Sequence, residues 1–207
     1  VLRTFEHKNC LEMAAAATVP VINGLSDFSH PCQALADLYT VREKYKNLKN
    51  KTLAYVGDGN NVCNSLLFIC AKLGVNINLG VPKGYEPDAA VLSASKDIAE
   101  KNNARVELFH NAFDAVKGSD VIYTDVWASM GQEEEAKARR EAFKDFQVNS
   151  SLVKTANKNA IVMHCLPAHR GEEITGEVLD SLNSVVFDQA ENRMHVQKAV
   201  LIKLLGR

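Results

Sequence analysis

The sequence predicts an α/β fold in which a parallel sheet is doubly wound, with helices on both of its faces. The alternation of two kinds of segment predicts it. Short apolar runs, such as residues 52–56 and 121–124, alternate with longer segments whose apolar residues recur every three or four positions. Strands that alternate with helices in this way form parallel βαβ units, whose right-handed crossovers place helices over both faces of the sheet.

The predicted strands are short apolar runs rich in β-branched residues. Residues 1–4 resemble the end of a strand, and residues 52–56 run directly into Gly57. The other predicted strands, in chain order, are residues 19–22, 77–81, 105–109, 121–124, 160–164 and 185–187.

The predicted helices show apolar residues at helical spacing. In residues 30–45, Leu35, Leu38 and Val41 recur every three positions, and the helix that follows residue 59 stops at Gly74. The other predicted helices are residues 88–101, 114–116, 133–144 and 191–205.

Composition restricts the classes of function. The chain has 207 residues and a formal net charge of −1, so it lacks the basic excess that binds nucleic acids and anionic membranes. Its longest apolar runs are too short to span a bilayer. The cysteine count of 5, an odd number in a chain too long to depend on disulfides, predicts free thiols in a reducing compartment. No signal peptide is visible, and because the first residue is not Met we expect a part of a longer protein.

Ligands of open parallel sheets bind at the carboxyl ends of the strands. The residues that follow the predicted strands are therefore the candidates for a site. Three of these segments carry chemically capable side chains, namely residues 57–62, 125–131 and 164–167.

Residues 57–62 read Gly-Asp-Gly-Asn-Asn-Val and lie between a strand and a helix. The pattern resembles a dinucleotide-binding fingerprint, but Val62 takes the place of the third glycine. A tight turn that requires small residues explains the segment equally well. The amides of Asn60 and Asn61 can both donate and accept hydrogen bonds, which suits a zwitterionic ligand.

Residues 125–131 follow another predicted strand. Asp125 could hold an ammonium group, while Ser129 and the backbone of Met130 could bind a polar tail. In the alternative interpretation, Asp125 or Ser129 caps the next helix. The charged run that follows, residues 133–145, is interpreted as a solvated helix face with ion pairs four residues apart, and we assign it no function.

Cys165 follows a predicted strand and is preceded by His164. Adjacent side chains of a strand point to opposite faces, so His164 is not expected to act as a base for Cys165. A partly buried thiol near an acid such as Asp125 could instead hold a substrate amine. In the alternative interpretation, Cys165 is a small core residue. Core packing is the interpretation that suits Cys10, Cys63 and Cys70. No CxxC pair is present, so no structural zinc site is expected.

The segment His30-Pro31-Cys32-Gln33 opens a predicted helix. Pro31 suits the first helical position. A helix N-terminus with a His and a Gln suits a polarised carbonyl or an anion, although His30 could also be a cap without a ligand. Arg3 and Arg193 are candidate anion clamps, because a guanidinium binds two phosphate oxygens at once.

Taken together, these segments resemble the ornithine carbamoyltransferase family, in the same order and from one end of the chain to the other. The pattern His-Pro-x-Gln at residues 30–33 marks the wider carbamoyltransferase group. Ser-Met-Gly at residues 129–131 and His-Cys-Leu-Pro at residues 164–167 distinguish the ornithine enzymes from the aspartate enzymes. The other matching segments are residues 3–5, 19–27, 35–37, 57–61, 125–128, 168–173 and 187–193.

The resemblance implies two domains. Residues 1–46 would be the end of a carbamoyl-phosphate domain with its connecting helix, and residues 47–187 would form a Rossmann-like ornithine-binding domain that begins at a polar hinge. Residues 188–207 would be a terminal helix that packs back on the first domain. The family's Ser-x-Arg-Thr-Arg phosphate loop is absent from this sequence. We therefore expect about the last two thirds of an enzyme, inactive on its own.

The resemblance also implies the activity. The carbamoyl group of carbamoyl phosphate would be transferred to the side-chain amine of L-ornithine, giving L-citrulline and phosphate, as in arginine biosynthesis. No metal and no organic cofactor are implied, because the donor is already activated. A homotrimer or a multiple of trimers in the cytoplasm is implied, with no nucleic-acid and no membrane partner.

Roles for individual residues follow from the same resemblance. The implied catalytic residues are Cys165, Asp125, Arg3 and His30. The implied carbamoyl-phosphate-binding residues are Arg3, Thr4, His30, Pro31, Cys32, Gln33, Cys165, Leu166 and Arg193. The implied ornithine-binding residues are Asn61, Asp125, Ser129 and Met130.

Three other functions remain open at this point. The first is a carbamoyltransferase for another amine or amino acid, such as putrescine or aspartate. The second is a nucleotide-dependent dehydrogenase, against which the incomplete glycine pattern counts. The third is an ornithine-binding module without activity.

Overall fold

The main sheet has five parallel strands in the order β5-β4-β3-β6-β7. The computed structural model describes residues 1–128 and 135–206. The strands are β3 (Thr52–Val56), β4 (Asn76–Gly80), β5 (Val106–Phe109), β6 (Val121–Thr124) and β7 (Ile161–His164). The order reverses between β3 and β6, so that the carboxyl ends of β3, β6 and β7 lie beside one another. The predicted doubly wound parallel sheet is confirmed.

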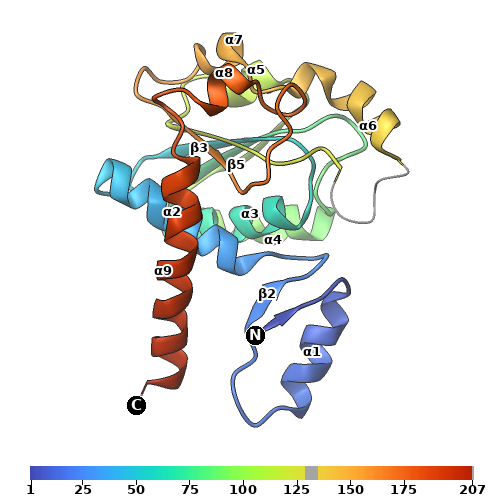
Figure 1. Cartoon of the computed structure of the whole chain (residues 1–207), viewed down its shortest axis with the longest axis vertical. Coiled ribbons are helices and arrows are strands. Elements are labelled where there is room, and N and C mark those ends of the chain that lie inside the picture. Colours follow the sequence, from blue (N-terminus) through green and yellow to red (C-terminus); the bar gives the residue numbers. More distant parts are fainter. Residues whose placement is uncertain (129–134, 207) are drawn as a thin grey trace.

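Helices cover both faces of this sheet (Figure 1). On one face, α2 (Pro31–Tyr45), α3 (Asn61–Leu73) and α4 (Ala89–Lys101) form a core with the strand residues Leu53, Tyr55 and their neighbours. The opposite face packs a second core against α5, α6, α7 and α8. The bounds of these helices are α5 (Ala112–Val116), α6 (Ala136–Phe143), η2 (Lys144–Phe146), α7 (Ser150–Val153) and α8 (Gly176–Leu179).

A smaller unit precedes the main sheet. The strands β1 (Leu2–Arg3) and β2 (Asn23–Leu25) pair in parallel, and α1 (His7–Ala16) connects them. Helix α2 leads from this unit to the large sheet, and the last helix, α9 (Val186–Leu205), packs along α2 and extends past the sheet (Figure 1). None of the described helices combines the length and the apolar character needed to cross a membrane.

Polar contacts, some of them buried, hold α9 on α2. The side chain of Asn192 donates to Thr40 Oγ1 at 3.0 Å and to Glu43 at 2.6 Å, and Lys44 forms an ion pair with Asp188 at 2.6 Å. These contacts fix one side of α9 against α2.

Two predicted strands are wrong. Residues 19–22 are not a strand, and the pairing with β1 comes later, in β2, after a first bond from Leu2 N to Ile22 O. Residues 185–187 are also not a strand, because α9 begins at Val186. The chain meets the edge of β7 just before this helix, through the backbone bonds from Val162 N to Asn183 O and from Val185 N to Val162 O. In both places the β-branched composition suggested a strand, and tertiary packing decided otherwise.

The remaining predicted elements agree closely with the structure. Strands β3 and β6 have the predicted bounds, and α3 ends at Gly74, whose φ of 70° is the left-handed conformation that glycine adopts without strain. The predicted apolar spacing in α2 is partly wrong, because Leu35 is exposed while Leu38 and Val41 are buried. The sequence did not predict α1, α7 and α8.

The turn after β3 depends on the absence of a side chain at Gly59. A Cβ atom there would lie 2.3 Å from the backbone nitrogen of Pro87. We expect Gly59→Ala to lower the free energy of unfolding by about 1–3 kcal/mol, because backbone must move to admit the methyl group. Urea denaturation followed by circular dichroism measures this.

A matched control is Gly176→Ala at the start of α8, where the nearest atom is the flexible Arg170 Nη1 at 3.3 Å. That variant is expected to match the parent within about 0.5 kcal/mol. Equal stabilities of the two variants would contradict the close approach at Gly59.

Candidate active site

A cavity of about 710 Å³ opens between the carboxyl ends of the main strands and the small N-terminal unit. Its walls bring together nine of the sequence-predicted site residues, namely Arg3, Thr4, His30, Gln33, Asn61, Asp125, Cys165, Leu166 and Arg193. Pro31 and Cys32 do not line it. Pro31 is the first residue of α2, and the thiol of Cys32 is turned toward the Asn23 carbonyl at 3.5 Å. Ser129 and Met130 lie outside the described residues.

The carboxylate of Asp125 is the centre of one side of the cavity. It follows β6 and is 5% exposed. The Cys165 thiol, which follows β7, donates to its Oδ1 at 2.9 Å, and the Asn60 amide donates to its Oδ2 at 2.8 Å. The Val126 backbone N–H also donates to Oδ1. Asp125 therefore gathers donors from the ends of neighbouring strands, and none of these bonds makes it a helix cap.

The thiol of Cys165 is held in its neutral form. Burial, and secondly the charge of Asp125 beside it, raise the pKa of Cys165 well above its ordinary value. A neutral thiol is a poor nucleophile. The geometry therefore favours a positioning contact for Cys165 over covalent catalysis.

The imidazole of His164 is bonded away from this thiol. Its Nε2 donates to the buried Glu173 carboxylate at 2.9 Å, and its Nδ1 accepts from the Leu166 backbone N–H at 2.9 Å. Although atoms of Asp125, His164 and Cys165 lie within 4.8 Å of one another, both nitrogens of His164 are engaged. The Cys165 thiol and the Asp125 carboxylate are likewise bonded to each other, so hydrogen bonds within the protein engage all three side chains.

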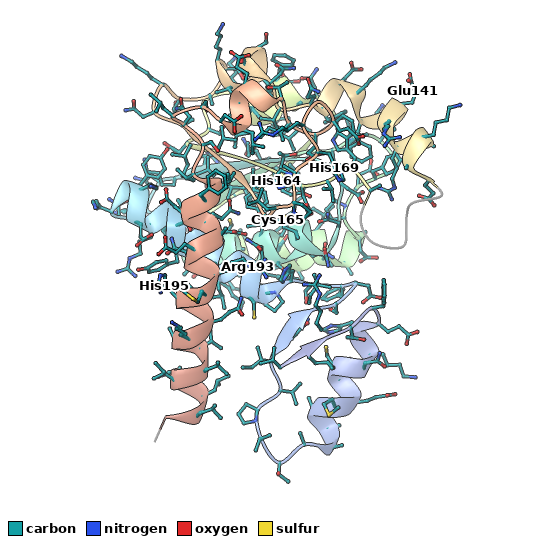
Figure 2. The ribbon with its side chains drawn as sticks, in the orientation of Figure 1. Glu141, His164, Cys165, His169, Arg193 and His195 are labelled. Carbon is teal, nitrogen blue, oxygen red and sulfur yellow. The ribbon has the colours of Figure 1, made fainter. Side chains whose placement is uncertain are left out.

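The opposite side of the cavity carries positive charge around a neutral histidine. Burial, followed by the charges of Arg193 and Arg3, lowers the pKa of His30 to about 4. Arg3 comes from β1, and Arg193 comes from α9 below the carboxyl edge of the sheet where Cys165 lies (Figure 2). His30 is thus a neutral hydrogen-bonding group near two guanidinium groups.

Three buried polar atoms of this side have no hydrogen-bond partner among the described residues. They are His30 Nδ1, Gln33 Oε1 and Arg193 Nε. His30 occupies the N-cap position of α2, but its side chain makes no capping bond. Buried polar atoms are nearly always paired, so unpaired atoms on residues that line one cavity indicate a polar ligand.

The segment from Gly57 to Val62 forms a tight turn and a helix cap. The Asn60 side chain accepts from the backbone N–H groups of Val62 and Cys63, both at 3.0 Å. The Asn61 amide donates to the Ser26 carbonyl at 2.6 Å and so links α3 to the N-terminal unit. Asn60 therefore orients Asp125, and only Asn61 remains a candidate for direct ligand contact.

Arg139 is one of several cavity residues that the sequence reasoning missed. Arg139 belongs to the charged run that was interpreted as a solvated face, and its predicted pair with Glu135 is present at 3.3 Å. However, Arg139 is buried and donates to Asp58 at 2.9 Å and to the Trp127 carbonyl at 3.0 Å, while its guanidinium lies over the ring of Tyr85. The interpretation as a solvated residue is wrong for Arg139. Its position four residues after Glu135 is equally typical of an exposed ion pair, so the sequence could not show that Arg139 is buried.

The remaining cysteines behave as predicted. Cys10, Cys63 and Cys70 are buried among apolar residues, and all five cysteines are free.

The neutral state of His30 predicts a pH dependence of stability. The unfolded chain binds a proton near pH 6.5, whereas the folded chain binds it near pH 4. The free energy of unfolding should therefore fall by roughly 2–4 kcal/mol as the pH drops through this window. Denaturant titrations at pH 7, 6, 5 and 4 should show a shallower fall for His30→Asn. An unchanged pH slope in that variant would contradict the burial of a neutral imidazole.

The buried Arg139–Asp58 ion pair predicts that substitutions of these two residues have strongly coupled effects on the free energy of unfolding. Arg139→Met should cost about 3–5 kcal/mol, because it leaves the buried Asp58 carboxylate without its partner. Adding Asp58→Asn to that variant should restore part of the loss. Urea denaturation of the two single variants and the double variant measures the coupling, and a double variant no more stable than Arg139→Met would refute it.

Comparison with known proteins places these features in one family. The model of the aspartate/ornithine carbamoyltransferase Asp/Orn binding domain matches residues 49–204, and the model of the carbamoyl-P binding domain of the same enzymes matches residues 1–43. The ornithine carbamoyltransferase of Thermococcus kodakarensis is 57% identical over 99% of this chain and 65% of its own length. The anabolic ornithine carbamoyltransferase of Pyrococcus furiosus is 56% identical over 99% of this chain and 65% of its own length.

Solved structures agree with the sequence relatives. The ornithine carbamoyltransferase structure from Pyrococcus furiosus superposes with a TM-score of 0.95 at 56% identity and covers 99% of this chain and 66% of that one. The structure from Gloeobacter violaceus gives a TM-score of 0.92 at 47% identity, over 99% and 68% of the two chains. The chain spans about 65% of the length of the curated relatives it matches. With matches to both domain models in the expected order, the chain belongs to the aspartate/ornithine carbamoyltransferase family.

Proposed function

We propose that the protein containing this chain transfers the carbamoyl group of carbamoyl phosphate to the side-chain amine of L-ornithine, giving L-citrulline and phosphate. The observation that carries the proposal is the 2.9 Å contact between the Cys165 thiol and the Asp125 carboxylate, in one cavity with Arg3, His30 and Gln33. Relatives named ornithine carbamoyltransferase at 56–57% identity support it.

On the carbonyl side, the chain supplies donors for a developing negative charge. Attack on a carbonyl carbon places charge on its oxygen, and preorganised donors lower the barrier. Arg3 and the neutral His30 are proposed to donate to this oxygen, with Thr4 beside them. Arg193 adds positive charge to the same region.

On the amine side, the reacting nitrogen must be neutral. An alkylammonium group resembles lysine, with a pKa of about 10.4, and is mostly protonated at pH 7. Enclosure disfavours the charged form. Asp125 and the neutral Cys165 thiol are proposed to orient the amine, and Asn61 with Ser129 and Met130 is proposed to hold the amino-acid end of ornithine.

The proposed step is balanced without a metal or an organic cofactor. The lone pair of the amine forms the new C–N bond, and the bond between the carbonyl carbon and the bridging phosphate oxygen breaks. Phosphate departs with that electron pair and accepts the proton that the amine loses. No thioester forms on Cys165, in keeping with its neutral thiol.

The arrangement of the whole protein is also a proposal. Residues 1–46 are assigned to the carbamoyl-phosphate domain and its connecting helix, residues 47–187 to the ornithine domain, and residues 188–207 to the returning helix. We further infer a homotrimer or a multiple of trimers, located in the cytoplasm and without nucleic-acid or membrane partners. Sedimentation equilibrium of the full-length protein tests the assembly.

Substitution of Cys165 tests the proposed activity. In the full-length enzyme, Cys165→Ala should lower kcat/KM for ornithine roughly 10- to 100-fold, because a contact to the reacting amine is lost. The effect should change with pH, since the contact favours the neutral amine. Citrulline formation, measured at several ornithine concentrations between pH 6 and 9, gives kcat and KM separately.

The control is Cys10→Ala, which removes a buried thiol from α1 outside the cavity. It should leave both constants unchanged. Unchanged constants for Cys165→Ala across this pH range would remove Cys165 from the mechanism. Absence of citrulline formation by the parent enzyme would refute the function itself.

A further inference from the structure

We propose that Asp37 is a positioning residue that fixes which end of the Gln33 amide faces the cavity. It thereby makes the site that binds the carbamoyl donor selective for a terminal –C(=O)NH2 group over a group in which methyl replaces the amino group. The inference rests on the proposed function and adds a cause of specificity to it. Asp37 belongs to the matching segment 35–37, but none of the residue roles given above includes it.

The carboxylate of Asp37 lies in the middle of the protein, fully buried on α2. Its Oδ1 accepts from two amides, Gln33 Nε2 and Gln189 Nε2, each at 2.7 Å. Its Oδ2 accepts from the hydroxyl of Tyr123 at 3.0 Å. Three elements, α2, α9 and β6, therefore meet at one carboxylate.

An ionised carboxylate can only accept hydrogen bonds, which settles the orientation of Gln33. If the amide were flipped, its oxygen would face Asp37 Oδ1 and two acceptors would meet in a buried place. Gln33 Nε2 is therefore committed to Asp37. The remaining end, Oε1, is buried and has no partner among the described residues, on a side chain that lines the cavity. A buried acceptor so placed calls for an N–H donor on the ligand.

The same carboxylate also reaches a second part of the site. Because Gln189 gives its Nε2 to Asp37, its Oε1 is free to accept from the backbone N–H of His164, at 3.0 Å. The imidazole of His164 in turn accepts from the N–H of Leu166, which has a φ of 59° and lines the cavity. Asp37 is thus connected to Leu166, which lines the same cavity as Gln33.

Protonation of Asp37 does not release the two amides. Burial raises the pKa of Asp37 to about 7, against the opposing effect of its three donors and of Arg193. Both amides occupy Oδ1, so a proton would reside on Oδ2, which faces only the Tyr123 hydroxyl. A hydroxyl can accept as well as donate, and the orientation of Gln33 is therefore the same in both states.

A purely structural role is the competing explanation. In that case the buried cluster only holds α2, α9 and β6 together, and any substitution within it has the same effect. A substitution of Tyr123 distinguishes the two explanations, because its hydroxyl belongs to the cluster but does not contact Gln33. They also separate at Asp37→Asn, because an asparagine can present its oxygen to both amides and its nitrogen to the Tyr123 hydroxyl.

The experiment compares two stable probes of the donor site in the full-length protein. Phosphonoacetamide ends in –C(=O)NH2, and acetonylphosphonate carries a methyl group in place of the amino group. Isothermal titration calorimetry gives both affinities for the parent and for Asp37→Leu, Asp37→Asn and Tyr123→Phe. Circular dichroism establishes that each variant is folded.

The parent is expected to bind phosphonoacetamide at least about tenfold more tightly than acetonylphosphonate, the size of one good hydrogen bond. In Asp37→Leu this preference should fall to about twofold or less, through weaker binding of the amide probe alone. Asp37→Asn and Tyr123→Phe should keep the preference of the parent. If Asp37→Leu does not fold, Asp37→Ser, which is too short to reach the Gln33 amide, takes its place.

The outcomes distinguish the two levels of the proposal. A folded Asp37→Leu or Asp37→Ser variant with the preference of the parent would overturn the role of Asp37, and so would an equal loss in Tyr123→Phe. A parent protein that binds neither probe would instead count against the proposed function.

Discussion

The chemistry of this chain depends on the side-by-side placement of three strand ends. Because β3, β6 and β7 are parallel neighbours, the residues that follow them share one edge of the sheet. Asp125 stands at the middle of this edge and receives the Cys165 thiol from one side and the Asn60 amide from the other. Each donor comes from a different crossover, so the carboxylate becomes a common reference point for segments that are distant in sequence.

The second constraint is electrostatic. Two guanidinium groups and a buried imidazole lie on the side of the cavity opposite to Asp125 and Cys165. Burial, and after it the positive charges of Arg193 and Arg3, keep His30 neutral and so preserve it as a directional hydrogen-bonding group. The guanidinium groups of Arg3 and Arg193 and the carboxylate of Asp125 present both signs of charge within one cavity. This polarity suits an anionic donor and an amine acceptor better than a single uncharged ligand.

Much of the fold could be predicted because the central strands are buried on both faces. The runs at 52–56 and 121–124 are short, apolar and bounded by turns, and their limits in the structure are the predicted ones. The run at 185–187 has a similar composition but lies beside β7, where the chain forms two backbone bonds with Val162 before it turns into α9. The composition of residues 185–187 alone cannot predict that they form no strand, because their contacts with β7 and α2 determine the outcome.

The site shows the same division. Family motifs and the rule for strand ends brought Cys165, Asp125 and His30 into consideration, and the cavity contains all three. The sequence reasoning did not identify the residues that support these three side chains. Arg139 has the spacing of a surface ion pair, and Asp37 has the spacing of an ordinary helical contact with Gln33. Their importance comes from burial, which depends on elements far along the chain.

The positions of Arg3 and Arg193 have a consequence for biosynthesis. These two side chains line the same cavity although they are far apart in the sequence, and the later one is carried by α9. During translation the sheet and its thiol–carboxylate pair emerge well before that helix leaves the ribosome. A chain terminated before α9 would lack Arg193 together with the buried contacts of Gln189 and Asn192 to α2, so the pocket gains its full charge only after this helix has been made and has packed.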